Sequence, residues 1–280
     1  MRTIAVDQIR DVICRMVQHI NIEYPDDIRR CMETALQKEQ HPTARSTLQF
    51  LIRNAAIARE ERLPICQDTG MAVIFLRVGQ DVHFTGGSLR DAIDQGVAMG
   101  YEQGYLRKSV VDDPLFERIN TRTNTPAIVY TEICEGEQVE ILVGAKGFGS
   151  ENMSTITMLK PAQGIQGVKG AVLSAIRQAG PTARPPMAVG VGIGGTFDYA
   201  AILAKKATLR EALHSEDPRY AALEEELLQE ANALGIGPQG LGGDTSVFRI
   251  NIEHYPTHIA GLPCAVNISC HVTRHAKEVL

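Results

Sequence analysis

The sequence predicts a mixed α/β fold, with helices packed around a mixed sheet in one compact domain spanning residues 1–280. Apolar residues recur at helical spacing in several segments, and short β-branched apolar runs lie between those segments. No Pro/Gly/Ser-rich linker and no internal repeat divides the chain. A hydrophobic content of 44% and a charged content of 22% are typical of a globular protein that buries a sizeable core.

The elements follow in order from spacing and turn residues. Helices are expected in the first 60 residues (including 43–62) and over 88–104, 168–179, 197–207 and 217–234. Strands are expected over 71–84 (a pair), 126–133, 138–143, 187–192, 247–252 and, as the last one, 265–269. Turns at 79–81 and 135–137 predict that the strands on either side of each turn pair with each other. Ser88 is expected to cap its helix, and Pro218 stands at a first helical position.

Charge and composition exclude several classes of function. The net charge is −5 and no long basic run occurs, so neither nucleic-acid binding nor membrane-surface binding is indicated. The N-terminus has no signal-peptide pattern, and no stretch approaches the roughly 20 apolar residues of a membrane span. A cytoplasmic location is therefore expected. The six cysteines then predict reduced thiols or metal ligands, and no Cys-x-x-Cys pair is present.

The segment 64–70 is the first candidate site. It places Cys66, Gln67, Asp68 and Thr69 in succession, immediately before the apolar run 71–76. A rigid strand fixes the reactive side chains next to its end, and many active sites lie at the ends of strands. On local grounds Cys66 is compatible with a nucleophile, a metal ligand or a space-filling residue.

Three glycine-rich loops are expected in the second half of the chain, at 146–152, 190–196 and 235–245. The second matches a dinucleotide-binding pattern, but no strand ending in an acidic residue follows at the required distance, so a strand-to-helix turn made for packing is favoured over NAD binding. The first loop could cradle a substrate carboxylate on its backbone amides, with a polar-capped helix start as the alternative.

The cysteines divide into two groups. Cys14, Cys31 and Cys134 lie in or at the ends of predicted elements and are expected to be structural. Cys66 and Cys270 each stand beside polar residues at the edge of an apolar run, which makes them the candidate ligands. Thiolates in such positions can hold an iron–sulfur cluster.

Together the motifs resemble a known family. The matching pieces are ICQDTG (65–70), ERINTRTN (117–124), KGFGSENMS (146–154), GVGIGGT (190–196), IGPQGLGG (236–243) and HIAGLPCAVNISCH (258–271). They cover nearly the whole chain in order, and the chain resembles the alpha part of class I fumarate hydratases and L-tartrate dehydratases, which are iron–sulfur hydro-lyases. As a set the motifs are specific, although each one alone is weak.

The resemblance implies a [4Fe-4S] cluster held by three cysteines, and reversible hydration of a dicarboxylic acid, most simply fumarate to malate. It also implies the roles of individual residues. Cys66 and Cys270 match two of the ligands, while Gln67 and Asp68 match the catalytic and substrate-binding pair beside the first ligand. The remaining substrate contacts match the side chain of Arg107 and the backbone of Gly149.

One position departs from the family pattern. The family carries its middle cysteine in a Cys-Pro-Pro segment, and this chain has Arg184 before Pro185-Pro186. A guanidinium stays protonated and cannot serve as an ordinary ligand. Cys264, six residues before Cys270, is weighed as a substitute ligand, with a core-filling role as the favoured reading. The departure raises the alternative of a non-catalytic paralogue that acts as an interaction subunit.

Single-chain members of the family carry a second, swivelling domain, which this chain does not contain. The resemblance therefore implies a separate beta subunit that completes the site, in an assembly built on an alpha homodimer or an α2β2 tetramer. L-tartrate remains the alternative substrate to fumarate.

Overall fold

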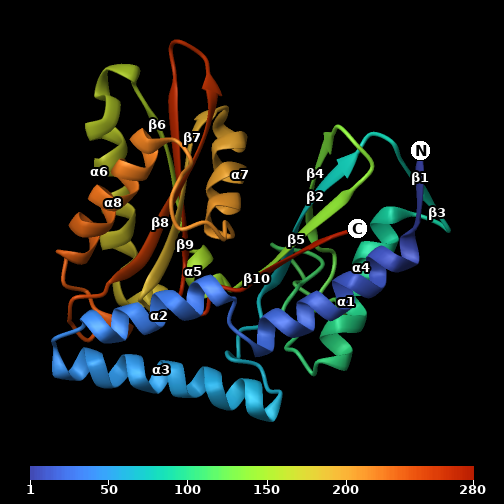
Figure 1. The fold of residues 1–280 in the computed structure, drawn as a ribbon, viewed down its shortest axis with the longest axis horizontal. Helices are drawn as coiled ribbons and strands as arrows, with labels where there is room; N and C mark the ends of the chain where they lie inside the picture. Colours follow the sequence, from blue (N-terminus) through green and yellow to red (C-terminus); the bar gives the residue numbers. More distant parts are fainter. The chain divides into compact units, whose positions relative to one another are not determined.

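The chain forms two units that draw on interleaved stretches of sequence. The computed structural model describes all of residues 1–280 (Figure 1). The first unit contains residues 1–25, 55–147 and 274–280, and the second contains 26–54 and 148–273. Because the chain passes repeatedly between the units, no single linker in the sequence marks their boundary. None of the helices is both long and apolar enough to cross a membrane.

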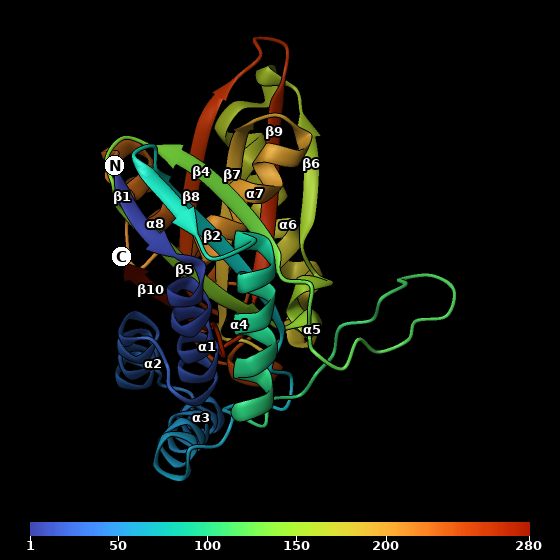
Figure 2. The same cartoon turned by 90° about the vertical axis from the view of Figure 1, so that its right-hand side faces the viewer.

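The first unit is a four-stranded mixed sheet covered by helices. Its elements are β1 (Arg2–Ala5), α1 (Val6–Ile22), β2 (Met71–Gly79), β3 (Val82–Thr85), α4 (Leu89–Gln103), β4 (Ile128–Cys134), β5 (Val139–Lys146) and β10 (His275–Val279). The sheet order is β10-β5-β2-β4, and β1 pairs separately with β3. Figure 2 shows the segment between α4 and β4 extending away from this unit as a long loop.

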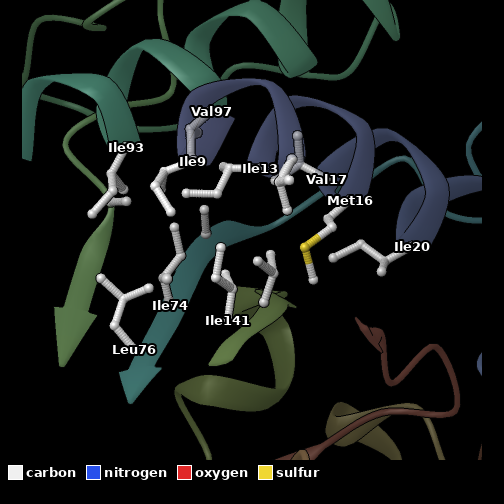
Figure 3. Close-up of a cluster of buried hydrophobic side chains, with 14 of the residues drawn as sticks. Ile9, Ile13, Met16, Val17, Ile20, Ile74, Leu76, Ile93, Val97 and Ile141 are labelled. Atoms are coloured by element: carbon white, nitrogen blue, oxygen red, sulfur yellow. The ribbon is translucent and has the colours of Figure 1, made fainter. Parts of the chain in front are cut away.

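Helices α1 and α4 bury their apolar stripes against the sheet. Ile9 and Ile13 of α1, Val97 of α4, and Ile74 and Ile141 of the central strands are all fully buried in one cluster (Figure 3). The apolar positions of α1 recur every three or four residues and those of β2 every second residue, so each element presents one apolar face to the other. This packing holds β2 rigid directly behind the candidate loop.

Both expected hairpins are wrong, although their strands and turns are present. Strand β2 pairs with β4 in parallel and with β5 antiparallel, and so lies between the two strands that were expected to pair. Strand β3 leaves this sheet and pairs in parallel with β1. Strand β2 is buried along most of its length, and the central place of a sheet suits a strand of that kind better than an edge does.

The second unit is a sheet with helices on both faces. Its elements are α2 (Asp26–Lys38), α3 (Pro42–Glu61, whose last residues belong to the first unit), α5 (Phe148–Glu151), β6 (Thr155–Leu159), α6 (Gly164–Ala179), β7 (Met187–Gly195), α7 (Phe197–Thr208), α8 (Pro218–Asn232), β8 (Val247–Thr257), β9 (Leu262–Ser269), and three short 3₁₀ turns, η1 (Pro161–Gln163), η2 (Gly180–Ala183) and η3 (Pro238–Gly240). The order is β6-β9-β7-β8. Helices α6 and α8 cover one face and α7 the other (Figure 1).

Local signals placed most elements correctly. The Ser88 hydroxyl accepts a hydrogen bond from the Asp91 amide (3.2 Å), and Asp217 caps α8 by accepting from the Arg219 amide (2.9 Å). Three strands were not expected. Strand β1 is only four residues long, β6 has five residues, and β10, not β9, is the last strand. All three are short and pair with distant strands, so they carry little periodic signal.

The second glycine loop serves packing. A Cβ on Gly190 would lie 2.1 Å from the Ala204 carbonyl oxygen, and one on Gly192 would lie 2.0 Å from that of Ala200. The two glycines therefore let β7 approach the backbone of α7 more closely than any side chain would permit. The geometry agrees with the packing interpretation of this loop and gives no support to NAD binding.

Candidate active site

The loop 66–70 is fixed at the entrance to β2. Gly70 has a φ of +76°, and a Cβ there would lie 2.8 Å from the backbone of Lys146 on β5, so the turn requires glycine. The Ile65 amide donates to the Asn21 carbonyl (2.8 Å), and the Gly70 amide donates to Asp68 Oδ1 (3.0 Å). Neighbouring backbone therefore orients the Asp68 carboxylate. Cys66 and Asp68 are half-buried, and Gln67 is exposed.

Arg107 belongs to the same part of the first unit. The Thr69 hydroxyl donates to the Arg107 carbonyl (2.8 Å), which places the arginine directly beside the loop that carries Asp68. Its neighbour Leu106 is buried, whereas Arg107 itself is exposed. The structure thus brings together Gln67, Asp68 and Arg107, which lie about 40 residues apart in sequence.

A second arginine borders Asp68 and was not expected from the sequence. A Cβ built on Gly147 would lie 3.0 Å from Asp68 Oδ2 and 3.6 Å from Arg274 Nη2, so both groups face the same glycine. Arg274 is 2% exposed and donates to Asn21 Oδ1 (2.8 Å). Sequence reasoning missed it because nothing in its local pattern distinguishes it from a surface arginine.

In the second unit, the structure places Arg184 beside Cys270. Cys270 is half-buried and follows β9 directly. The amide of the next residue, His271, donates to the Arg184 carbonyl (3.3 Å). Arg184 has left-handed backbone angles (φ 55°, ψ 65°) and an exposed side chain. A bulky residue held in this conformation is strained, and such strain concentrates at functional sites.

The third glycine loop secures this arginine turn. The Gln239 amide and its side-chain Nε2 each donate to the Pro185 carbonyl (2.8 Å for both). Gln239 Nε2 also lies 3.2 Å from His271 Nδ1. Gln239 of the 236–243 loop therefore contacts both the segment that carries Arg184 and the segment that carries Cys270. The sequence did not predict this structural role.

Gly149 lies in the short helix α5. Gly149 is exposed, and a Cβ at this position would meet no atom within 4 Å, so the packing of the fold does not require glycine here. Glu151 of α5 pairs with Lys205 and accepts from Asn267 Nδ2 (2.9 Å), which ties the helix to α7 and β9. Burial lowers the pKa of Lys205, and the Glu151 carboxylate opposes that effect.

The donor set does not fit a [4Fe-4S] cluster held by three thiolates. Cys66 and Cys270 offer two thiols, and the third position carries the guanidinium of Arg184, which has no electron pair to donate. Cys264 does not replace it, because it is 1% exposed inside the second core and burial raises the pKa of its thiol to about 12. Six residues along a strand also separate it from Cys270 by about 20 Å.

The other cysteines lie in or at the ends of helices and strands, and none of the six forms a disulfide. Cys14 is buried in α1, Cys31 lies in α2 and Cys134 ends β4, as expected. No group of three His, Cys, Asp or Glu side chains is arranged to hold a metal ion.

A cavity of about 880 Å³ lies elsewhere in the second unit. It is bounded by α2, α8 and the beginning of β8. Its charged lining contains both signs, including Arg30, Lys38, Glu211 and Glu225. None of the candidate residues lines it, and this mixture of charges indicates no particular ligand.

Comparisons with known proteins agree with the motifs. The family described as Fumarate hydratase (Fumerase) matches residues 10–279. The putative L(+)-tartrate dehydratase subunit alpha of Methanocaldococcus jannaschii is 39% identical over 274 residues, covering 96% of each chain. The L(+)-tartrate dehydratase subunit alpha of Escherichia coli K12 is 30% identical over 271 residues, 95% of this chain and 88% of the relative. The chain therefore belongs to the fumarate hydratase (Fumerase) family and is an alpha-type hydro-lyase subunit of the fumarate hydratase and tartrate dehydratase kind.

Proposed function

We propose that this chain, together with a separate beta subunit, adds water to or removes water from a four-carbon dicarboxylic acid. The observation that carries the proposal is the hydrogen bond between the Thr69 hydroxyl and the Arg107 carbonyl, which brings the backbone of Arg107 beside the loop that carries the Asp68 carboxylate. A dicarboxylate that loses water needs such a pair: a cation to hold one carboxylate, and a polar group to handle a proton or the leaving hydroxyl.

The roles follow from the chemistry of each group. Hydration of fumarate adds a hydroxyl to C2 and a proton to C3. Asp68, oriented by the Gly70 amide, is suited to move that proton or to hydrogen-bond the hydroxyl. Arg107 offers a two-pronged contact to one substrate carboxylate, and the family motif at 146–154 predicts a backbone contact to the substrate at Gly149. The Gln67 carboxamide can donate to the substrate and accept from it.

The substrate is fumarate or L-tartrate. The matching family is described as a fumarate hydratase, and the relatives in the comparisons are named for L(+)-tartrate. The decisive test supplies the alpha and beta chains with each acid in turn and follows loss of the fumarate double bond or formation of oxaloacetate. Asp68→Asn and Arg107→Ala should each abolish most turnover. Full activity in either variant would remove that residue from the site.

The beta partner is proposed from the alpha designation of the relatives. Light scattering of the co-expressed chains should give the mass of an α2β2 assembly, and of the alpha chain alone the mass of a homodimer. An alpha chain that turns over either acid without any partner would contradict the two-subunit proposal.

Arg184 supports a second candidate, a non-catalytic alpha chain that serves as an interaction subunit. The family's iron–sulfur chemistry would need a third thiolate where this chain has a guanidinium. Iron and sulfide content of anaerobically purified protein should be low for the natural chain and should rise in Arg184→Cys. Turnover gained only in that variant would support the second candidate, whereas turnover by the natural chain would eliminate it.

A further inference from the structure

Two buried side chains converge on the backbone beside Asp68. The hydroxyl of Tyr101, at the end of α4, lies 2.8 Å from the Thr69 carbonyl and 2.9 Å from the Gly70 carbonyl. Asn124 Nδ2 donates to the Gly70 carbonyl at 3.0 Å. Tyr101 and Asn124 are both 0% exposed, so no solvent competes for these bonds. The two residues that follow Asp68 are therefore held from two directions.

The side-chain oxygen of Asn124 binds the segment that follows Arg107. Its Oδ1 accepts from the amides of Ser109 (2.6 Å) and Val110 (3.2 Å). The same segment is tied to the loop a second time, through the Thr69 hydroxyl and the Arg107 carbonyl. The Asp68 loop and the Arg107 segment are thus joined by two independent links, and each link ends within three residues of Asp68 and of Arg107.

The two side chains are suited to this task. Asn124 adopts a φ of +60°, which asparagine tolerates better than most residues do, and its amide supplies a donor and an acceptor on opposite sides. Burial raises the pKa of Tyr101 strongly, so its hydroxyl remains a neutral donor. The positive charge of Arg274 lowers this pKa and the negative charge of Asp68 raises it. Neither residue reaches the exposed surface where Arg107 would meet a substrate.

We propose that Tyr101 and Asn124 are positioning residues for the Asp68 and Arg107 pair: the Tyr101 hydroxyl fixes the loop that follows Asp68, and Asn124 sets the spacing between that loop and the Arg107 segment. The inference rests on the proposed roles of those two groups and adds residues that do not touch the substrate themselves. A dicarboxylate has a fixed length, so a carboxylate and a guanidinium can act on it together only at one spacing. Displacement of reacting groups by about 1 Å can cost about 100-fold in rate.

The test measures L-malate binding by calorimetry and fumarate hydration by the assembled alpha and beta chains. Tyr101→Phe removes a single hydroxyl, and Asn124→Gly removes the side chain while keeping the left-handed backbone unstrained. Each should weaken malate binding by about tenfold, with a comparable loss of kcat/KM. Ser88→Ala is the matched control, because Ser88 accepts from the Asp91 amide (3.2 Å) at the other end of α4 and contacts neither the loop nor the Arg107 segment. It should bind malate normally.

A double-mutant cycle with Arg107→Ala separates positioning from general destabilisation. If the two residues act through Arg107, Tyr101→Phe should change malate affinity by less than about twofold once Arg107 is gone. Equal effects in both backgrounds, or normal affinity in Tyr101→Phe, would overturn the proposal while leaving the site intact. Normal affinity and turnover in Arg107→Ala and Asp68→Asn would instead overturn the proposed function. Tyr101→Phe carries the test alone if Asn124→Gly fails to fold.

Discussion

Gly147 offers a direct way to displace the Asp68 carboxylate without touching it chemically. In Gly147→Ala the new Cβ would lie 3.0 Å from Asp68 Oδ2, whereas ordinary contacts begin at 3.4 Å, so the carboxylate has to shift by at least a few tenths of an ångström. Asp68 Oδ1 is meanwhile held at 3.0 Å by the Gly70 amide, so the shift becomes a rotation of the carboxylate. A misalignment of this size predicts a loss of kcat/KM of about 10- to 100-fold.

The fold should survive this change. Gly147 does not occupy the positive-φ region, so alanine meets no backbone strain there. A glycine-to-alanine change at a compatible position stabilises by about 0.4–1 kcal/mol through the unfolded chain, which offsets part of the local contact. We therefore expect the free energy of unfolding to change by less than about 1 kcal/mol while the rate falls.

The assay compares fumarate hydration and urea unfolding for the assembled wild type, Gly147→Ala and Gly170→Ala. Gly170 lies inside α6, and a Cβ there would meet nothing within 4 Å, so this control should keep full activity. The reasoning is refuted if Gly147→Ala retains wild-type kcat/KM in a protein that Asp68→Asn inactivates. In that event the position of the carboxylate beside Gly147 would not matter for turnover.

Three further predictions follow from burial. Ile74→Ala should destabilise the protein by about 2–5 kcal/mol in urea titrations, because Ile74 is fully buried in the first core, whereas the exposed Ile165→Ala should change little. Asp27→Ala should cost about 3–5 kcal/mol, because it leaves Arg249, which is 1% exposed, without its carboxylate partner; loss comparable to that of the exposed Asp26→Ala would contradict the pairing. The folded-state pKa of Cys264, raised to about 12, predicts stability that is complete below the unfolded thiol's pKa near 9 and declines as the pH rises above it. Cys264→Ala should lack this decline, and mass spectrometry should find Cys264 unalkylated by iodoacetamide at pH 8 in the folded protein.

The candidate site was only partly visible in the sequence. Gln67, Asp68 and Arg107 came from motif matches, and the structure unites them in one unit through the Thr69 hydroxyl. Tyr101, Asn124 and Arg274 were missed, because each looks locally like an ordinary core or surface residue. Their importance comes from contacts across 14 to 253 residues of sequence, which no local pattern encodes.

The sequence by itself determined most of the segments that become helices and strands, although it missed β1, β6 and β10 and placed several ends a few residues away. Periodic apolar residues and capping side chains such as Ser88 act over a few neighbouring positions, so they can be read directly. It also determined the family, and with it the departure at Arg184. Only the tertiary structure decided that β2 lies between β4 and β5, that Gln239 clasps the Arg184 turn, and that Tyr101 and Asn124 hold the Asp68 loop. Strand order and buried hydrogen bonds depend on which distant surfaces exclude water together, and that is settled only when the whole chain packs.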